Sequence, residues 1–160
     1  MDKIKEKLIE LAGNIGEGLG LNRTTCQIYA LLYLNSKPLS PSQITKELGI
    51  SKGNVSINLK KLEDWNAVEK VWKRGHTRPL YKANEDIEGI IINKLQTGLL
   101  KRINEIRKYL KEIKKNIEKV KNEKLIKNKI KEIEKLTDKL EFFSKNLKYL
   151  QSYSTIISSK

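Results

Sequence analysis

The sequence is poor in the residue types that build metal centres and disulfides. Cys26 is the only cysteine and His76 the only histidine among the 160 residues. A zinc site with four Cys or His ligands therefore cannot form within one chain, and neither can an intrachain disulfide. We expect no metal and no cofactor, and the cysteine usage favours a reducing compartment.

Long apolar runs are also missing. The start of the chain, MDKIKEKLIELAGNIG, alternates charged and apolar positions, which is unlike the continuous apolar segment of a signal peptide. No stretch approaches the roughly 18 apolar residues that a membrane-spanning helix needs. These patterns favour a cytoplasmic protein with no membrane partner.

The sequence also lacks the residue combinations that form a catalytic site. The sequence offers no second histidine, no reactive-thiol context around Cys26 and no recognisable convergent carboxylates. We therefore expect no catalytic residues and no enzyme activity. Tyr29, Tyr33, Trp65 and Trp72 could line a small-molecule pocket, although core packing is the simpler explanation for them.

Positive charge is what the chain has in abundance. It carries 33 Lys and Arg against 19 Asp and Glu, a formal net charge of +14. Such a charge attracts a polyanion such as nucleic acid or an anionic membrane surface. Lys far outnumbers Arg, so part of the excess, above all in the C-terminal half, could instead reflect genome composition or a heat-adapted surface.

Apolar periodicity divides the chain into three segments. They are an N-terminal helix with a Gly-rich connection (1–22), a winged helix-turn-helix domain (23–84) and a helical coiled dimerisation region (85–160). In the first segment, Ile4, Leu8, Leu11 and Ile15 recur at helical spacing. Gly16, Gly18 and Gly20 follow them and predict that this helix ends there.

Helix-capping signals define the middle segment. Asn22 or Thr24 can cap its first helix. The next helix, residues 41–48, has Ser40 as N-cap, a capping box with Gln43, and a glycine after its last turn. Ser51 caps the following helix, which extends to residue 65. Two short helices joined by a tight turn make a helix-turn-helix.

A change of period after residue 65 predicts a β-hairpin. The stretches AVEKVW and LYKA are typical of strands, and KRGHTRP between them is typical of a turn. The hairpin therefore occupies residues 67–83 and has a basic loop. The predicted fold class is mainly α with a small β wing.

Beyond Asn84 the apolar residues recur at steps of three and four, which indicates a heptad seam over two helices. The first helix is expected to end near Val120 and the second near Tyr149, with a turn or stutter at 121–124. The seam can pack on the following helix of the same chain or on a second copy, and we expect self-association as a homodimer. The predicted dimerisation residues are Ile106, Leu110, Ile113, Ile117, Leu136, Leu140, Phe143 and Leu147.

The helix from residue 51 to 65 has one apolar side and one polar, cationic side. If Val55, Leu59 and Leu62 face the core, Ile57 projects almost opposite them, where a thymine methyl group could cover it. A helix fits the major groove of DNA, where amides, hydroxyls and ammonium groups meet base edges and phosphates. The predicted DNA-binding residues are Ser51, Lys52, Gly53, Asn54, Ser56, Ile57, Asn58, Lys60 and Lys61 in this helix, and Lys73, Arg74 and Arg78 in the hairpin loop.

Residues 18–83 resemble the winged helix-turn-helix domain of MarR-type transcription regulators. The resemblance is strongest to the GbsR-like branch and rests on GLGL, IYALLYL, and ISKGNVS followed by L..LE.W. It implies a homodimer on a pseudo-palindromic operator, often a repressor released by a small molecule. Arg78 resembles the wing arginine, and His76 stands where many wings have an acidic residue.

The sequence thus predicts a sequence-specific regulator that binds double-stranded DNA as a homodimer, most simply as a repressor. It places helix 51–65 in the major groove and wing 67–83 on the backbone or minor groove. A small-molecule effector of unknown identity is a further expected partner. Two alternatives stay open, a sequence-tolerant architectural DNA-binding protein and a winged-helix protein-interaction module.

Overall fold

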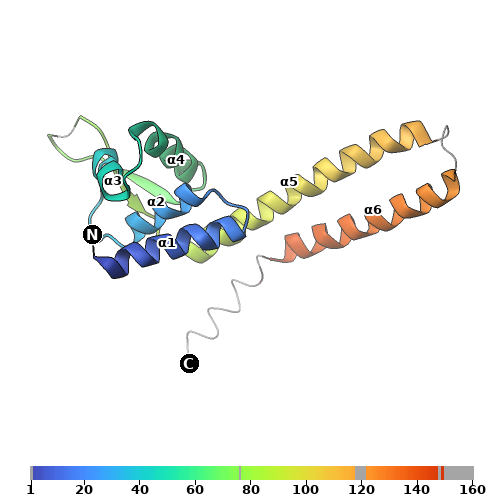
Figure 1. Cartoon of the computed structure of the whole chain (residues 1–160), viewed down its shortest axis with the longest axis horizontal. Helices are drawn as coiled ribbons and strands as arrows, with labels where there is room; N and C mark the ends of the chain where they lie inside the picture. Colours follow the sequence, from blue (N-terminus) through green and yellow to red (C-terminus); the bar gives the residue numbers. More distant parts are fainter. Residues whose placement is uncertain (1, 76, 118–121, 148, 150–160) are drawn as a thin grey trace, which may run out of the picture. The chain divides into compact units, whose positions relative to one another are not determined.

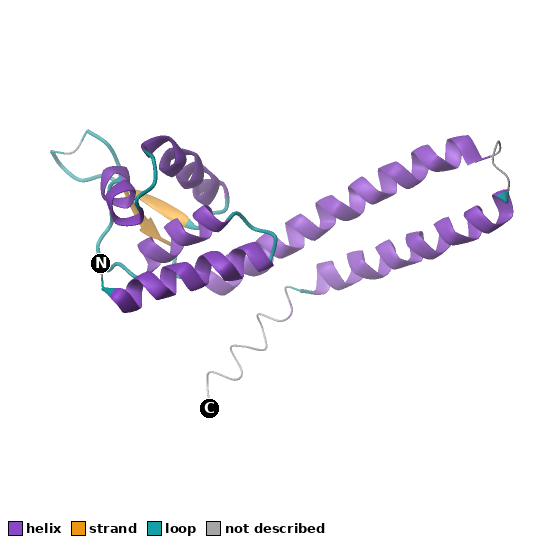
Figure 2. Ribbon diagram, viewed as in Figure 1, coloured by secondary structure: helices purple, strands orange, loops and turns teal. Residues whose placement is uncertain are grey.

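The computed structural model describes residues 2–75, 77–117, 122–147 and 149. The chain forms two compact units, residues 1–90 and residues 91–160. The elements are α1 (Lys3–Gly18), α2 (Arg23–Tyr33), α3 (Pro41–Leu48), α4 (Lys52–Asp64), β1 (Val68–Val71), β2 (Leu80–Ala83), α5 (Ile87–Asn116) and α6 (Glu123–Asn146) (Figure 1). A mostly helical chain with a small antiparallel sheet confirms the predicted winged helix-turn-helix fold (Figure 2).

The first unit has a single apolar cluster at its centre. Buried side chains from α1 to α4 and from both strands form this cluster, with Ile28, Leu31, Ile44 and Val55 fully inaccessible to solvent. Since each helix contributes one apolar stripe to it, the cluster fixes α3 and α4 in the helix-turn-helix arrangement.

The caps that start these helices are largely those expected from the sequence. The Ser40 hydroxyl accepts a hydrogen bond from the Gln43 amide, while Gln43 Oε1 accepts one from the Ser40 amide. Gly49 ends α3 in the left-handed region, with φ 63°. Asn22, rather than Thr24, caps α2, because its Oδ1 accepts from the Thr25 amide at 3.0 Å.

Helix α1 ends at Gly18, within the glycine-rich stretch that was predicted to end it, although Gly16 itself lies inside the helix. Gly16 is buried where α1 packs on α2, and a Cβ there would stand 2.2 Å from Cys26 Sγ. Glycine at this position therefore allows close helix packing and does not break the helix. The packing of α1 on α2 also partly removes the Cys26 thiol from water. This desolvation raises the pKa of the thiol and so disfavours the reactive thiolate.

The wing is a two-stranded antiparallel sheet. Its register pairs Val68 with Ala83 and Val71 with Leu80. Leu39, which lies before α3, exchanges two backbone hydrogen bonds with Tyr81, at 2.8 and 2.9 Å, and so ties the wing to the helix-turn-helix. The loop between the strands therefore extends from an anchored base.

Two of the four aromatic residues considered as pocket residues, Tyr29 and Trp65, lie in or against the core. Trp65 packs against the apolar cluster, and the Tyr29 hydroxyl donates to the Asn84 carbonyl oxygen at 2.7 Å. Burial, chiefly, raises the pKa of Tyr29 to about 12. Tyr33 stacks on Tyr29, with ring centroids 5.8 Å apart, whereas Trp72 is exposed. Core packing therefore accounts for Tyr29 and Trp65, whereas Tyr33 and Trp72 are exposed.

The second unit is a helical hairpin, so the chain reverses between α5 and α6 (Figure 1). Ion pairs join Arg107 to Asp138 at 2.7 Å and Lys114 to Glu134 at 2.5 Å, which fixes an antiparallel register. Fully or nearly buried residues recur every seventh position on both helices. They are Ile103, Leu110 and Ile117 on the first arm, and Ile130, Thr137 and Ser144 on the second.

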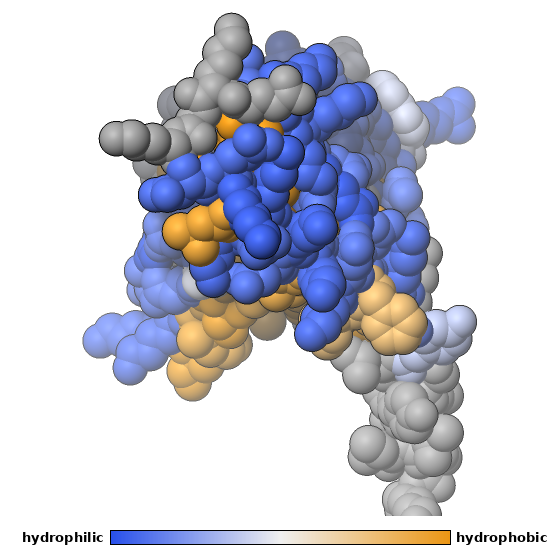
Figure 3. All heavy atoms as spheres, turned by 90° about the vertical axis from the view of Figure 1, so that its right-hand side faces the viewer, coloured by the Kyte–Doolittle hydropathy of each residue, from blue (hydrophilic) through white to orange (hydrophobic). Residues whose placement is uncertain are grey.

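The hairpin corrects part of the predicted dimerisation seam. Leu110 and Ile117 are only 6% and 4% exposed, because they pack between the two arms of one chain. They are therefore intrachain contacts. Leu140 and Leu147 are half-buried. The remaining predicted residues are exposed, namely Ile106, Ile113, Leu136 and Phe143. Figure 3 shows hydrophobic side chains at places on the mostly hydrophilic surface that faces the viewer. The seam position Val120 lies outside the described residues.

Candidate nucleic-acid interface

Helix α4 separates a buried side from an exposed one. Val55, Leu59 and Leu62 are at most 2% exposed and pack in the core, whereas Ile57 is 61% exposed. An exposed isoleucine in the middle of a polar face has no partner among the core residues. The helix therefore presents one apolar contact point surrounded by polar groups.

The predicted DNA-binding residues lie at the surface, with one exception. The exposed members are Ser51, Lys52, Gly53, Asn54, Ser56, Ile57, Lys60 and Lys61 on or at the start of α4, and Lys73, Arg74 and Arg78 in the wing loop. Within the described ranges, none of the six cations among them forms an ion pair. By contrast, Lys70 at the wing base is bonded to Glu63 at 2.7 Å, which raises the pKa of Lys70. His76 lies outside the described residues.

Asn58 is the exception, and the expectation that it contacts DNA directly is wrong for this conformation. It is 3% exposed because it lies three residues after Val55, on the buried side of α4. Its Oδ1 accepts from the Thr25 hydroxyl at 2.6 Å, and its Nδ2 donates to the Asn54 carbonyl oxygen at 2.8 Å. Asn58 thus connects α2 to the recognition helix from inside the fold.

A recess joins three elements of this surface that are separate in sequence. It has a volume of about 230 Å³ and is lined by residues at the start of α3, on α4 and on the wing. Lys52, Ser56 and Arg78 are three of them. The sequence analysis missed Ser42, which also lines the recess. Its position in the first turn of α3, two residues after the cap residue Ser40, was the available signal.

The recess combines two cations, two serine hydroxyl groups and the start of a helix. The N-terminus of a helix carries a partial positive charge and unpaired amide groups. Together these groups suit an anion such as a phosphate of a nucleic-acid backbone.

Gly53 stands in the first turn of α4, next to these groups. A Cβ at this position would meet no described atom within 4 Å. Nothing in the described part of the chain therefore requires glycine there, and the open space lies on the side of the exposed face.

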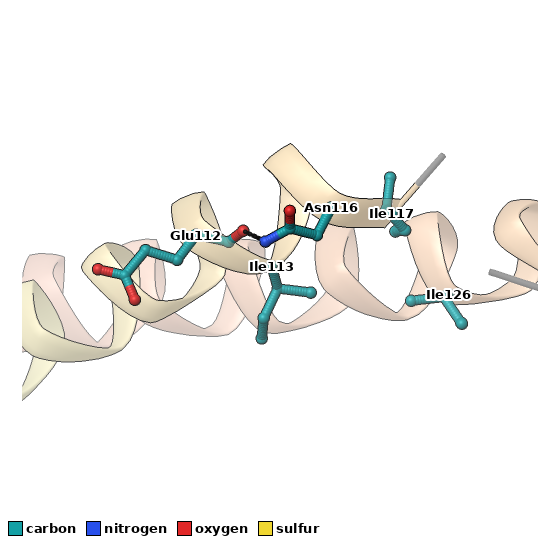
Figure 4. Close-up of a pocket in the computed structure, with 5 residues that line it drawn as sticks. All are labelled: Glu112, Ile113, Asn116, Ile117 and Ile126. Carbon is teal, nitrogen blue, oxygen red and sulfur yellow. Dashed lines mark hydrogen bonds between the residues drawn. The ribbon is translucent and has the colours of Figure 1, made fainter. Parts of the chain in front are cut away.

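A second recess lies at the tip of the helical hairpin (Figure 4). It has a volume of about 350 Å³ and is lined mainly by Ile113, Ile117 and Ile126. The Asn116 amide, also in its wall, donates to the Glu112 carbonyl oxygen at 3.3 Å. None of its five described lining residues is aromatic, so it is not an aromatic cage for a quaternary ammonium ligand.

The described part of the chain contains neither a metal-binding cluster nor a membrane-spanning helix. No group of three or more His, Cys, Asp or Glu side chains there is placed to hold a metal ion. No described helix has the length and apolar character needed to cross a membrane.

About half of the chain is similar to known proteins in sequence. Residues 19–78 match the model of the MarR family. The chain is 28% identical over 86 residues to the HTH-type transcriptional repressor OpcR of Bacillus subtilis (strain 168). The aligned segment covers 54% of this chain and 46% of OpcR. It is 24% identical to the putative HTH-type transcriptional regulator YvaV of the same organism, over 54% of this chain and 49% of YvaV. The matched segment thus spans about half the length of these relatives.

A solved structure described as a transcriptional regulator has the same fold. The TM-score is 0.70 at 14% sequence identity, over 94% of this chain and 98% of the other. At this identity the solved structure shows the fold alone, and the match to the MarR family covers residues 19–78.

Proposed function

We propose that the protein is a sequence-specific transcription regulator that binds double-stranded DNA as a homodimer and acts as a repressor. The observation that carries the proposal is the exposed face of α4, where amides, hydroxyls and unpaired cations surround Ile57. The motifs GLGL, IYALLYL and ISKGNVS favour the GbsR-like branch of MarR-type regulators. The expected location is the cytoplasm, and a small-molecule effector of unknown identity completes the proposal.

In this proposal α4 enters the major groove and the wing follows the DNA backbone. The first turn of α4 holds Lys52, Gly53 and Asn54, and the N-terminal residues of a recognition helix are those that contact base edges. The recess between α3, α4 and the wing receives a backbone phosphate, with Lys52 and Arg78 as its cations. Lys73 and Arg74 then lie on the backbone or in the minor groove.

Homodimerisation is supported by apolar rows that the described chain leaves exposed. Ile106 and Ile113 on α5, and Leu136 and Phe143 on α6, are 39% to 58% exposed and spaced by seven. The outer side of α1 carries a comparable row, formed by Ile4, Leu8, Leu11 and Ile15. A second copy that covers such rows would present two recognition helices with two-fold symmetry, on half-sites about 10 base pairs or a small multiple apart.

The test is selection of bound fragments from random DNA with the purified protein, followed by competition with random DNA. The expected result is a symmetric motif whose complex resists competition. Tight binding without a motif would instead indicate an architectural DNA-binding protein. If the protein has no affinity for DNA at all, the alternative of a winged-helix protein-interaction module is favoured. Asn54→Ala serves as the matched variant and should weaken specific binding by roughly 1 to 3 kcal/mol for each lost base contact.

A further inference from the structure

Four polar residues form a continuous chain of hydrogen bonds from the core to the DNA-facing surface. Asn22 caps α2 by accepting from Thr25, and the Thr25 hydroxyl contacts Asn58 Oδ1 at 2.6 Å. Asn58 Nδ2 in turn lies 2.8 Å from the Asn54 carbonyl oxygen and 2.6 Å from Asn54 Oδ1. Thr25 and Asn58 are buried, whereas Asn54 is exposed.

The donors and acceptors in this chain determine how the Asn58 amide is turned. A backbone carbonyl oxygen can only accept, so the atom of Asn58 beside the Asn54 carbonyl must be the amide nitrogen. Asn58 Oδ1 therefore faces the Thr25 hydroxyl, which donates to it. That hydroxyl has one hydrogen, and its distance to Asn58 Oδ1, 2.6 Å, is shorter than the 3.0 Å to Asn22 Oδ1.

The same logic determines how the Asn54 amide is turned. The second hydrogen of Asn58 Nδ2 points at the Asn54 side chain, so the atom that meets it must be the acceptor, Oδ1. Asn54 Nδ2 is left with both of its hydrogens, and no described residue accepts them. Asn58 and Thr25 are buried and already hydrogen-bonded to each other. Rotation of the Asn54 amide would therefore leave one hydrogen of Asn58 Nδ2 without an acceptor, which is unfavourable.

We infer that Thr25 and Asn58 are positioning residues that make Asn54 a hydrogen-bond donor toward DNA. This inference rests on the proposed function. Asn54 Oδ1 is turned toward Asn58, so the side chain presents its two donor hydrogens outward. Such a donor group selects a base edge that offers acceptors, and guanine presents two of them, N7 and O6, in the major groove. Adenine is disfavoured, because its two-bond pairing with asparagine needs an outward acceptor as well as a donor. Asn54 therefore specifies guanine at one position of each half-site.

The orientation of the two amides can be tested on the free protein. Hydrogen exchange of the side-chain NH2 groups, followed by NMR and assigned with Asn54→Ala, should show a protected Asn58 amide and a freely exchanging Asn54 amide. The opposite pattern would overturn the inference, whatever DNA the protein binds. This measurement needs no operator, so it separates failure of the inference from failure of the proposed function.

The base preference is tested on the motif selected from random DNA. Replacing its guanine by 7-deazaguanine, which lacks the N7 acceptor, should weaken the wild-type complex about fivefold for the lost hydrogen bond. The same replacement should not further weaken binding of Asn54→Ala. If Asn54→Ala lowers affinity for every DNA equally, Asn54 contacts phosphate and the inference is wrong.

The positioning role is tested with Asn58→Leu and with a matched pair at Thr25. Asn58→Leu removes the amide but keeps an apolar fit, and it should lower the preference for guanine over adenine about fivefold. Thr25→Val should act in the same direction, and Thr25→Ser, which keeps the hydroxyl, should restore the preference. A purely structural role would lower affinity for all sequences and leave the base preference intact. Should Asn58→Leu fail to fold, the Thr25 pair decides the outcome.

Discussion

The two units of the chain differ in how they carry charge. Residues 1–90 hold 14 Lys and Arg against 11 Asp and Glu, a net charge of +3. Residues 91–160 hold 19 against 8, a net charge of +11. The unit with the proposed DNA-reading surface is therefore the less charged one. Net charge alone would have assigned DNA binding to the helical hairpin.

Placement of the charges explains the difference. The winged-helix unit pairs several cations elsewhere, as Arg23 does with Glu10 and Glu17, whereas the six on its reading face form no ion pair with any described residue. Their fields therefore add on one side of the domain. In the hairpin, pairs such as Arg107 with Asp138 lie among lysines spread along both helices. Such a distribution suits a solvated surface, or sequence-tolerant attraction to a polyanion.

The largest expected effect concerns the exposed apolar row of the hairpin. Ile113→Glu places a charge in this row at a position that is 49% exposed, so the monomer should still fold. If the row is the dimer interface, the variant should sediment as a monomer. Loss of the second DNA-binding head should lower operator affinity by about 10² or more. Sedimentation and DNA binding measure the two effects.

Asn104→Glu is the matched control for that variant. It adds the same charge to the same helix at an exposed position outside the apolar row. We expect it to remain dimeric and to bind the operator like the wild type. An Ile113→Glu protein that stays dimeric would instead point to the outer side of α1 as the interface.

The next effect concerns the exposed isoleucine of the reading face. Ile57→Ala removes apolar surface that should cover a thymine methyl group, so specific binding should weaken by about 1 to 2 kcal/mol. Thermal stability should hardly change, because Ile57 is 61% exposed. Leu125→Ala, at a 57% exposed position in the hairpin, is the control and should leave DNA binding unchanged. Equal effects of both variants would contradict a specific contact at Ile57.

A smaller effect, on the salt dependence of DNA binding, distinguishes the cations of the reading face from the lysines of the helical hairpin. Arg78→Ala should reduce the salt dependence of DNA binding by about one phosphate equivalent, which is about fivefold in affinity at 0.15 M salt. Lys139→Ala removes a charge from an exposed site of the hairpin and should leave the slope unchanged. If Lys139→Ala lowers the slope as much as Arg78→Ala does, the diffuse charge binds DNA and the architectural alternative gains support.

Sequence analysis succeeded where the deciding interactions are local. The capping box of Ser40 and Gln43 and the cap at Ser51 depend on residues within one turn, and the structure shows them at the predicted places. A heptad pattern likewise predicted both long helices. It could not assign Leu110 to an intrachain seam, because the same spacing serves a partner helix from either chain.

The misjudged residues depend on packing between segments that are distant in sequence. Asn58 was assigned to DNA by its residue type, although its spacing from Val55 and Leu62 places it on the buried side of α4. Gly16 was interpreted as a helix breaker, because only the packed α1 and α2 reveal how close Cys26 lies. The recess with Ser42 could not be predicted either, since three separate elements form it.

The smallest expected effect compares two glycines, one in each unit, that have open space around their Cα. A Cβ at Gly53 or at Gly98 would meet no described atom within 4 Å, so alanine fits at both sites in the free protein. Gly98→Ala, inside α5, should stabilise the fold by up to about 1 kcal/mol and leave DNA binding unchanged. Gly53→Ala, in the first turn of α4, should stabilise it less and yet weaken DNA binding, because the added methyl group lies where the duplex approaches. Thermal unfolding and operator titration of both variants measure this, and equal affinities would show that the backbone at Gly53 stays clear of the DNA.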